Sequence, residues 1–295
     1  MLQWDAANRP RRSKRGTPGL PATEMATAHP NNNMESLRNV ARVLALSTVC
    51  WAARPAALAA TFTANPAADA FVATGPTGNL ADNNYGGGGA LVVAAPGLPG
   101  GEFQTVMQFD LSAAAGTFNA LYGAGGWSIQ SVSLQLTASP HGNAIYNPSA
   151  AGQFGVSLMQ NNNWVEGTGN ASNPTTDGIT YNQLVNLLIN PATDQDEGTF
   201  GYNGQTSSAA VYHLPVGPAL SADILSGSDA TLRLFATDNV VSYLLNSRTT
   251  TPLSGAPELI ITVVPEPGGV GLAVVGWLAV ARARRPAPGR RLPRL

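Results

Sequence analysis

Side chains that could catalyse hydrolysis are few in the central part of the chain. Only His141 and His213 lie within residues 60–264, and neither has a carboxylate close by in the sequence to orient it as a general base. His141 stands in a Pro-His-Gly turn, and His213 follows an apolar run just before Pro215, so both are expected at the surface or at a strand edge. The only cysteine is Cys50, which leaves the central region without a thiolate nucleophile or a cysteine-built zinc site. We therefore expect no enzyme and no catalytic residue.

The densest acidic run is Asp194-Gln195-Asp196-Glu197. A calcium loop of the EF-hand type needs glycine-spaced Asp and Asn ligands and a distal glutamate, and this run lacks that spacing. We expect a solvated loop here, with a calcium loop as the less favoured alternative. The glycine run at residues 86–89 lacks the Lys-Ser/Thr of a phosphate-binding loop and precedes an apolar run, so we interpret it as a flexible turn.

Aromatic residues beside asparagines are the candidates for sugar binding. The C–H faces of sugars stack on exposed aromatic rings, and flanking amides hydrogen-bond the hydroxyl groups. This combination occurs at Trp164 after the asparagines at 161–163, at Tyr85 beside Asn83 and Asn84, and at Tyr202 beside Asn203. For Trp164 a position in the core is at least as good an interpretation, and for Trp127 it is the preferred one.

Charge is distributed unevenly along the chain. The formal net charge of the 295 residues is −1, but residues 60–264 hold thirteen acidic side chains and two basic ones, Arg233 and Arg248, and so carry −11. An acidic, lysine-free domain argues against nucleic acid and against polyanions held by charge alone. It favours solubility outside the cell, or divalent cations. Without cysteines the domain has no disulfide.

The same central region consists of short apolar or alternating runs separated by turn-forming residues. The clearest alternation is Val132, Leu134 and Leu136 with polar residues between them, which predicts a strand with one buried face. Strands are predicted at 70–72, 90–94, 105–109, 128–136, 154–159, 209–214, 230–236, 240–245 and 258–263. Only 181–189 and 218–225 are predicted as short helices. The fold class is therefore all-β, an antiparallel sandwich of the jelly-roll kind, without the repeats of a propeller or solenoid.

The N-terminal part of the chain has the pattern of an export signal. Residues 1–33 are basic and lack apolar periodicity, so they are expected to be disordered or to precede the true start at Met34; a nucleic-acid-binding arm is the less favoured alternative. Residues 34–59 have the layout of a secretory signal peptide. Its basic start, apolar run and cleavage site lie at Arg38 and Arg42, at 43–53, and at Ala57 and Ala59. We expect export through the Sec machinery and a working domain over 60–264.

The C-terminal part of the chain has the pattern of a membrane anchor. Pro265-Glu266-Pro267 stops the last predicted strand, and an apolar run follows over residues 268–281. This run of fourteen residues is shorter than the roughly 20 that a stable span needs, which favours transient insertion in the inner membrane. Its flanking anchors are Trp277, suited to an interface, and the arginines Arg282, Arg284 and Arg285, which stay on the cytoplasmic side.

This order of parts resembles the PEP-CTERM sorting signal of Gram-negative bacteria that make exopolysaccharide. The resemblance covers residues 265–285, and residues 286–295 form a basic tail beyond the point where such signals usually stop. It implies that an exosortase, a membrane cysteine protease, recognises the Pro-Glu-Pro motif, cuts the chain near it and passes the protein to the cell surface or matrix. The alternatives are an ordinary membrane tail and a Pro-x-Pro sequence that occurs by chance.

A second resemblance runs through the central domain. Six pieces are similar, in this order, to the DNRLRE family: Asp69-Ala70-Phe71-Val72, Asp82-Asn83-Asn84-Tyr85-Gly86, Val106-Met107-Gln108-Phe109-Asp110-Leu111, Val132-Ser133-Leu134-Gln135-Leu136, Trp164-Val165-Glu166-Gly167, and Ser247-Arg248 with the strand at 257–261. The family implies a jelly-roll sandwich on secreted bacterial proteins, counted among carbohydrate-binding modules. Sandwiches of this type often hold a structural calcium ion, for which Asp69, Asp82 and Asp238 are candidate ligands. Two departures are the Ile179-Thr180-Tyr181 sequence in place of a Thr-Trp pair and long inserts over 177–204.

Together these patterns predict an exported, non-catalytic sandwich that binds exopolysaccharide or another glycan at the cell surface or in the extracellular matrix. One alternative is a purely structural matrix or biofilm protein without a specific ligand. A secreted polysaccharide hydrolase or lyase is less favoured, because histidines and basic residues are scarce.

Overall fold

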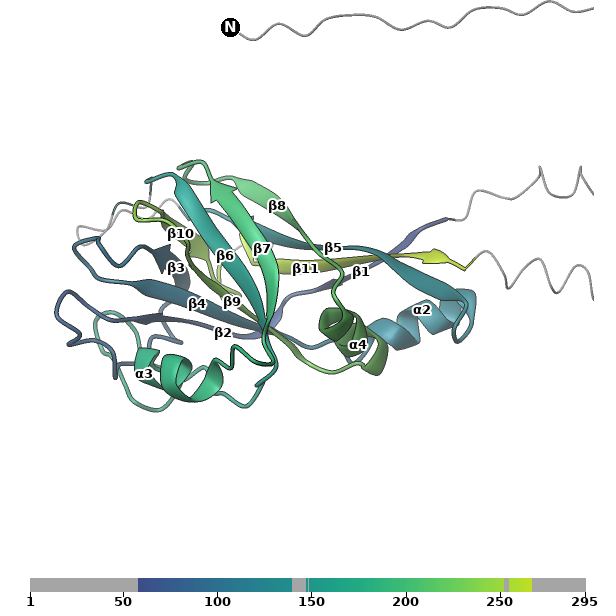
Figure 1. The fold of residues 1–295 in the computed structure, drawn as a ribbon, viewed down its shortest axis with the longest axis horizontal. Coiled ribbons are helices and arrows are strands. Elements are labelled where there is room, and N and C mark those ends of the chain that lie inside the picture. Colours follow the sequence, from purple (N-terminus) through teal and green to yellow (C-terminus); the bar gives the residue numbers. More distant parts are fainter. Residues whose placement is uncertain (1–57, 140–146, 148, 252–254, 267–295) are drawn as a thin grey trace, which may run out of the picture. The chain divides into compact units, whose positions relative to one another are not determined.

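The computed structural model describes residues 58–139, 147, 149–251 and 255–266, which form two antiparallel β-sheets packed as a sandwich (Figure 1). The strands of the first sheet are β1 (Ala60–Ala64), β5 (Trp127–Thr137), β8 (Ala209–Leu214) and β11 (Glu258–Pro265), in the order β1-β11-β5-β8. The strands of the second sheet are β2 (Pro66–Ala73), β3 (Ala90–Ala94), β4 (Phe103–Phe109), β6 (Gly152–Met159), β7 (Gln195–Tyr202), β9 (Ala230–Ala236) and β10 (Ser242–Asn246). Their order is β10-β3-β4-β9-β6-β7, with β2 paired to β4.

The main core lies between the two sheets. Val132, Leu134 and Leu136 of β5 are fully buried, and Leu134 and Val132 stand opposite Leu259 and Ile261 of β11. The second sheet contributes Met107, Phe109, Phe154, Val156, Leu158, Leu232 and Leu234. Each large side chain taken out of water in this way stabilises the fold by about 1.5–3 kcal/mol.

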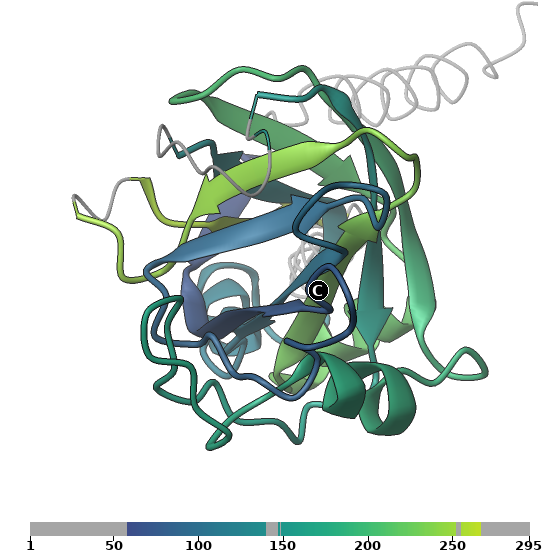
Figure 2. The same ribbon diagram turned by 90° about the vertical axis from the view of Figure 1, so that its left-hand side faces the viewer.

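The outer face of the seven-stranded sheet is covered as well. Helix α3 (Tyr181–Gln183) continues into the π-helical turn η1 (Leu184–Leu188), and both lie outside β2 (Figure 2). Ile179, Leu184 and Leu188 pack there against Ala70 and Val72 of β2. Strand β2 is therefore buried on both faces, unlike a strand of a half-solvated sheet.

Two further helices lie at the side and end of the sandwich. In α2 (Ala114–Tyr122), Phe118 is fully buried, with its ring centre 5.0 Å from that of Trp127 and 6.4 Å from that of Phe62. Helix α4 (Pro218–Ser226) begins with proline and ends at Gly227, whose φ of 72° is left-handed. No helix in the described ranges is long and apolar enough to cross a membrane.

Most of the predicted elements are confirmed, and β1, β7 and α2 were missed. All nine predicted strands and both predicted helices occur, with ends that differ by a few residues. Strand β1 was missed because its Ala-Thr alternation is weak. Helix α2 was missed because its start at Ala113 to Gly116 has the composition of a loop, although Ala114 and Phe118 have the i, i+4 spacing of a buried helix face.

The expectation of a solvated acidic loop at 194–197 was wrong. Residues 195–197 begin β7, and Glu197 is 1% exposed, with no hydrogen-bond partner for either carboxylate oxygen among the described residues. Strand β7 pairs with β6 through a register shift that places Glu197 at an irregular position in the ladder. Burial, and to a lesser degree the neighbouring Asp196, raises the pKa of Glu197 to about 7.

The variant Glu197→Gln tests whether the pKa of Glu197 is raised by its burial. The folded protein holds the Glu197 proton up to about pH 7, whereas an ordinary glutamate releases it near 4.5, so stability is lost as the pH rises through this window. The neutral variant should therefore be more stable than the wild type by about 1–3 kcal/mol at pH 8 and of similar stability at pH 4. Urea unfolding at both pH values measures the difference.

Asp229→Asn is the matched control, because Asp229 is exposed and its carboxylate makes no hydrogen bond among the described residues. It should leave the pH dependence of the wild type unchanged. If Glu197→Gln also left that dependence unchanged, the buried carboxylate would not be its source.

Candidate functional site

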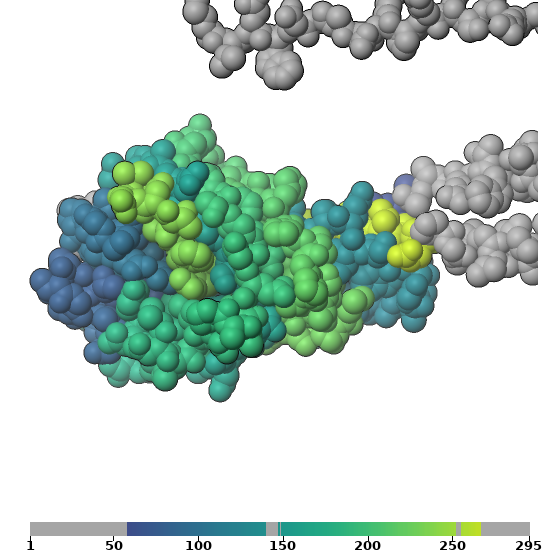
Figure 3. All heavy atoms as spheres, in the orientation of Figure 1, coloured from purple at the N-terminus to yellow at the C-terminus, as the bar shows by residue number. Residues whose placement is uncertain are grey.

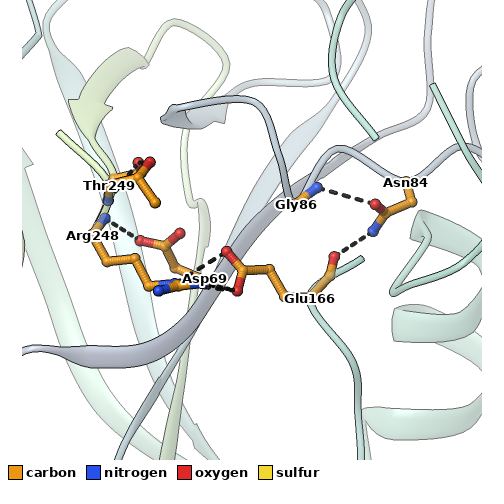
Figure 4. Close-up of polar contacts among 7 residues, drawn as sticks. Asp69, Asn84, Gly86, Glu166, Arg248 and Thr249 are labelled. Atoms are coloured by element: carbon orange, nitrogen blue, oxygen red, sulfur yellow. Dashed lines mark hydrogen bonds and ion pairs between the residues drawn. The ribbon is translucent and has the colours of Figure 1, made fainter. Parts of the chain in front are cut away.

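Four segments that are distant in the sequence meet in one polar cluster, formed by Asp69, Asn84, Glu166 and Arg248 (Figure 4). Asp69 belongs to β2, Asn84 lies in the connection from β2 to β3, and Arg248 follows β10. Glu166 belongs to residues 160–194, the covering segment, which leads from β6 across the outer face of the seven-stranded sheet to β7.

Asn84 is fully buried and uses both ends of its amide. Its Nδ2 donates to the carbonyl oxygens of Glu166 at 2.6 Å and Ile179 at 2.9 Å. Its Oδ1 accepts from the backbone N–H groups of Gly86 at 3.2 Å and Gly169 at 3.1 Å. Only an amide side chain supplies donors and an acceptor in this arrangement, so Asn84 fixes the covering segment at two places.

Glycines allow the backbones to approach closely at this point. A Cβ atom at Gly86 would lie 2.0 Å from the carbonyl oxygen of Glu166, and one at Gly169 would lie 2.1 Å from that of Asn84. Both distances are far below van der Waals contact. The start of the glycine run at 86–89 is therefore a packing site against the covering segment.

The charged members of the cluster pair with one another. Arg248 donates through Nε to both carboxylate oxygens of Glu166 at 3.1 Å and through Nη2 to Oε2 at 2.5 Å. The backbone N–H of Arg248 donates to Asp69 Oδ2 at 2.6 Å. Burial raises the pKa of Asp69 to about 7, opposed by that hydrogen bond and aided by the charge of Glu166. Because Asp69 is buried and Arg248 occupies both Glu166 oxygens, this arrangement suits a clamp better than an acid–base pair.

The two ends of the covering segment form the walls of an open groove, which we call the amide groove. It has a volume of about 600 Å³ and is lined by Gln160, Asn161, Asn162, Asn163, Leu187, Leu188, Asn190 and Thr193. The Asp194 carboxylate connects the two walls to each other, since it accepts from the backbone N–H of Gln160 at 3.0 Å and of Asn190 at 2.8 Å. The covering segment forms a continuous part of the molecular surface in the space-filling view (Figure 3).

The groove combines free amides with an exposed apolar side chain. The side-chain amides of Gln160 and Asn163 make no hydrogen bond to any described residue, while Asn162 Nδ2 donates to the carbonyl oxygen of Asp229 at 2.7 Å. Leu187 is 72% exposed. The groove can thus offer hydrogen-bond donors, acceptors and a small apolar surface, all without charge.

The structure places the predicted sugar-binding aromatic residues mainly in packing roles. Tyr85 is buried and stacked on Phe71, with ring centres 4.9 Å apart. Tyr202 is buried and stacked on Tyr243 at 3.9 Å, and its hydroxyl donates to the Gln205 carbonyl at 2.6 Å. Neither ring offers the exposed face that stacking on a sugar requires.

Trp164 is half-buried. It packs against the apolar cluster beneath the covering segment and donates from Nε1 to Thr231 Oγ1 at 3.2 Å. This agrees with the core interpretation. Trp127 is buried, as expected, and donates from Nε1 to Asn119 Oδ1 at 2.8 Å.

The predicted calcium ligands do not come together. Asp82 accepts from Asn182 Nδ2 at 2.7 Å, and Asp238 accepts from backbone N–H groups including that of Val241 at 2.8 Å, whereas Asp69 lies in the polar cluster. Within the ranges that the structure describes, no three His, Cys, Asp or Glu side chains are grouped so that they could hold a metal ion.

Several predicted positions lie outside the described residues, namely Ala57, His141, Pro267, Trp277, Arg282, Arg284 and Arg285. Of the remaining sorting and cleavage residues, Ala59 directly precedes β1 and Pro265 ends β11. The backbone N–H of Glu266 donates to the carbonyl oxygen of Gly126 at 2.9 Å. His213 belongs to the edge strand β8, and its Nδ1 lies 2.9 Å from Oγ of Ser133 in β5.

Sequence reasoning missed one wall of the groove. The asparagines at 161–163 were noted only as neighbours of Trp164, whereas Leu187, Asn190 and Thr193 gave no signal of their own. Their contribution depends on the covering segment returning to its start, which Asp194 fixes in the fold.

No protein-family model matches the chain, and no curated protein matches it significantly.

Asn84→Asp tests the role of the clamp. The new carboxylate would face the carbonyl oxygens of Glu166 and Ile179 without the two donors, so we expect a loss of about 3 kcal/mol or more in the free energy of unfolding. Limited proteolysis should also cut the covering segment faster. Urea unfolding and mapping of the proteolytic fragments measure the two effects.

Asn83→Asp is the control, because Asn83 is half-buried and, among the described residues, its amide donates only to Tyr85 Oη, at 3.2 Å. It should cost no more than about 1 kcal/mol. Equal losses in the two variants would contradict a special role for Asn84.

Proposed function

We propose that this chain is a non-catalytic carbohydrate-binding β-sandwich, of the jelly-roll type, that works outside the cell and holds a glycan in the amide groove. The observation that carries this proposal is the groove itself, an open hollow of about 600 Å³ whose lining is rich in neutral amides. The sequence predicted glycan binding by exposed aromatic rings, whereas the binding proposed here depends on the amide side chains of the groove.

Amide side chains suit a polyhydroxylated ligand. Each amide both donates and accepts, as does each sugar hydroxyl, so Gln160, Asn163 and Asn190 could each make paired hydrogen bonds. The exposed Leu187 offers an apolar contact for the C–H face of a sugar ring. The net charge of −11 over residues 60–264 disfavours a polyanion. The ligand we propose is therefore a neutral stretch of exopolysaccharide or a related neutral glycan.

The lining also supports binding over catalysis. None of the described residues that line the groove is Asp, Glu or His, whereas glycoside hydrolases generally act through a pair of carboxylates. The remaining alternative is a structural matrix or biofilm protein without a ligand, which would show no saturable binding.

We further propose that the N-terminal segment is a Sec export signal, which is cleaved at Ala57 and Ala59. The C-terminal segment would be a sorting signal that an exosortase recognises at Pro265-Glu266-Pro267. One strand pairing supports this arrangement. Ala60 of β1 pairs with Val263 of β11, so the two proposed processing sites flank the folded domain at neighbouring positions. The protein would be held in the inner membrane transiently and then released to the cell surface or matrix.

The double variant Gln160→Ala/Asn163→Ala tests the groove. Each lost hydrogen bond is worth about 0.5–1.5 kcal/mol, so we expect the affinity for a neutral glycan to fall by about tenfold or more. Affinity electrophoresis in gels containing the extracted exopolysaccharide measures the change. Thermal stability should be retained, since neither side chain makes a hydrogen bond to a described residue.

Asn173→Ala is the matched control, an exposed amide of the same covering segment outside the groove. It should bind like the wild type. Unaltered affinity of the double variant, or the absence of saturable binding by the wild type, would count against the proposal.

The intact mass of the protein recovered from the cell surface tests the sorting. A C-terminus near Pro267 that appears only when the host has its exosortase is the expected result. The same uncut C-terminus with and without the protease would mean that the tail is a simple anchor.

A further inference from the structure

Both ends of the folded domain are fixed to the same corner of the sandwich. Tyr122 Oη at the end of α2 donates to the carbonyl oxygen of Leu58 at 2.7 Å. The backbone N–H of Glu266 donates to the carbonyl oxygen of Gly126, in the turn between α2 and β5, at 2.9 Å. The start of β1 and the end of β11 thus leave the domain side by side, next to α2 (Figures 1 and 3). We call this corner, residues 60, 121–126 and 264–266, the exit end.

The exit end differs in charge from the rest of the domain. Its residues include a single charged side chain, Glu266, and residues 111–127, which contain α2 and the turn after it, hold no Asp, Glu, Lys, Arg or His. Leu121 is 61% exposed. A surface with an exposed leucine and Glu266 as its single charged side chain is unusual on a domain that carries −11 elsewhere, and it holds little of the acidic charge that an anionic membrane would repel.

The chain leaves little room between this surface and the proposed anchor. The apolar run begins at Gly268, two residues after Glu266, and two residues span at most about 7 Å. The polar layer on each side of a bilayer is itself about 5–7 Å thick. A run shorter than the hydrocarbon core also draws its flanking residues into the interface.

We propose that the exit end is a lipid-contacting surface, which lies in the headgroup layer of the membrane while the C-terminal run is inserted. This inference rests on the anchoring that is part of the proposed function. Because α3 lies toward the opposite end of the sandwich from the ends of β1 and β11, this part of the covering segment would be held away from the bilayer (Figure 1).

Site-specific fluorescence quenching tests the proposal. In the protein that begins at Ala60 after signal cleavage, which contains no cysteine of its own, an environment-sensitive fluorophore is attached at Leu121→Cys, or at Ala124→Cys as a second exposed position of the exit end. The protein is reconstituted in vesicles of phosphatidylethanolamine and phosphatidylglycerol that contain a lipid with a nitroxide on its headgroup. We expect most of the fluorescence at both positions to be lost.

Thr77→Cys is the control position, because Thr77 is exposed in the connection between β2 and β3. The label there should stay bright. If the protein floats with the vesicles but the labels at 121 and 124 are quenched no more than the one at 77, the exit end does not contact lipid, and the anchoring stands without it. If the protein does not float with the vesicles, the anchoring itself fails and this inference fails with it.

Discussion

The buried amide of Asn84 holds the covering segment on the outer face of the seven-stranded sheet, and the groove depends on that attachment. Its two donated hydrogen bonds reach backbone carbonyls at 166 and 179, and its accepted ones come from glycine N–H groups at 86 and 169. A buried amide with all these partners is stable, but loss of any one leaves a polar group unpaired away from water. The pair of Arg248 with Glu166 and the packing of Leu184 and Leu188 secure the same segment at further points. The amide groove lies at the two ends of the segment held in this way.

Much of the sandwich could be predicted because its buried strands have clear alternation. Val132, Leu134 and Leu136 alternate with polar residues, and the structure places them opposite β11 in the core. Strand β7 could not be predicted in this way, since the inward-facing positions of an ordinary strand are apolar and one of them here is Glu197. Its acidic neighbours gave the pattern of a loop, and only the pairing with β6 shows otherwise.

The candidate site was predicted in part. The asparagines at 161–163 were identified, but they were read as neighbours of an aromatic platform, and Trp164 instead packs beneath the covering segment. An aromatic residue beside asparagines can be buried or exposed, and the local sequence does not tell which. Tyr85 and Tyr202 have this pattern, and both are buried. The opposite wall at 187–193 is about 25 residues further along the chain, and only the tertiary fold brings it near. Asp69, Asn84, Glu166 and Arg248 are far apart in the sequence, and only the structure shows their contacts.

We propose the amide groove as the glycan site, and NMR of the side-chain amides can test this proposal. The NH₂ signals of Gln160, Asn163 and Asn190 would be followed while a neutral oligosaccharide from the extracted exopolysaccharide is added. We expect saturable shifts of these signals with one common affinity, while the Asn173 signal stays in place. Saturable shifts confined to another surface, or no shifts with a ligand that the protein does bind, would contradict it.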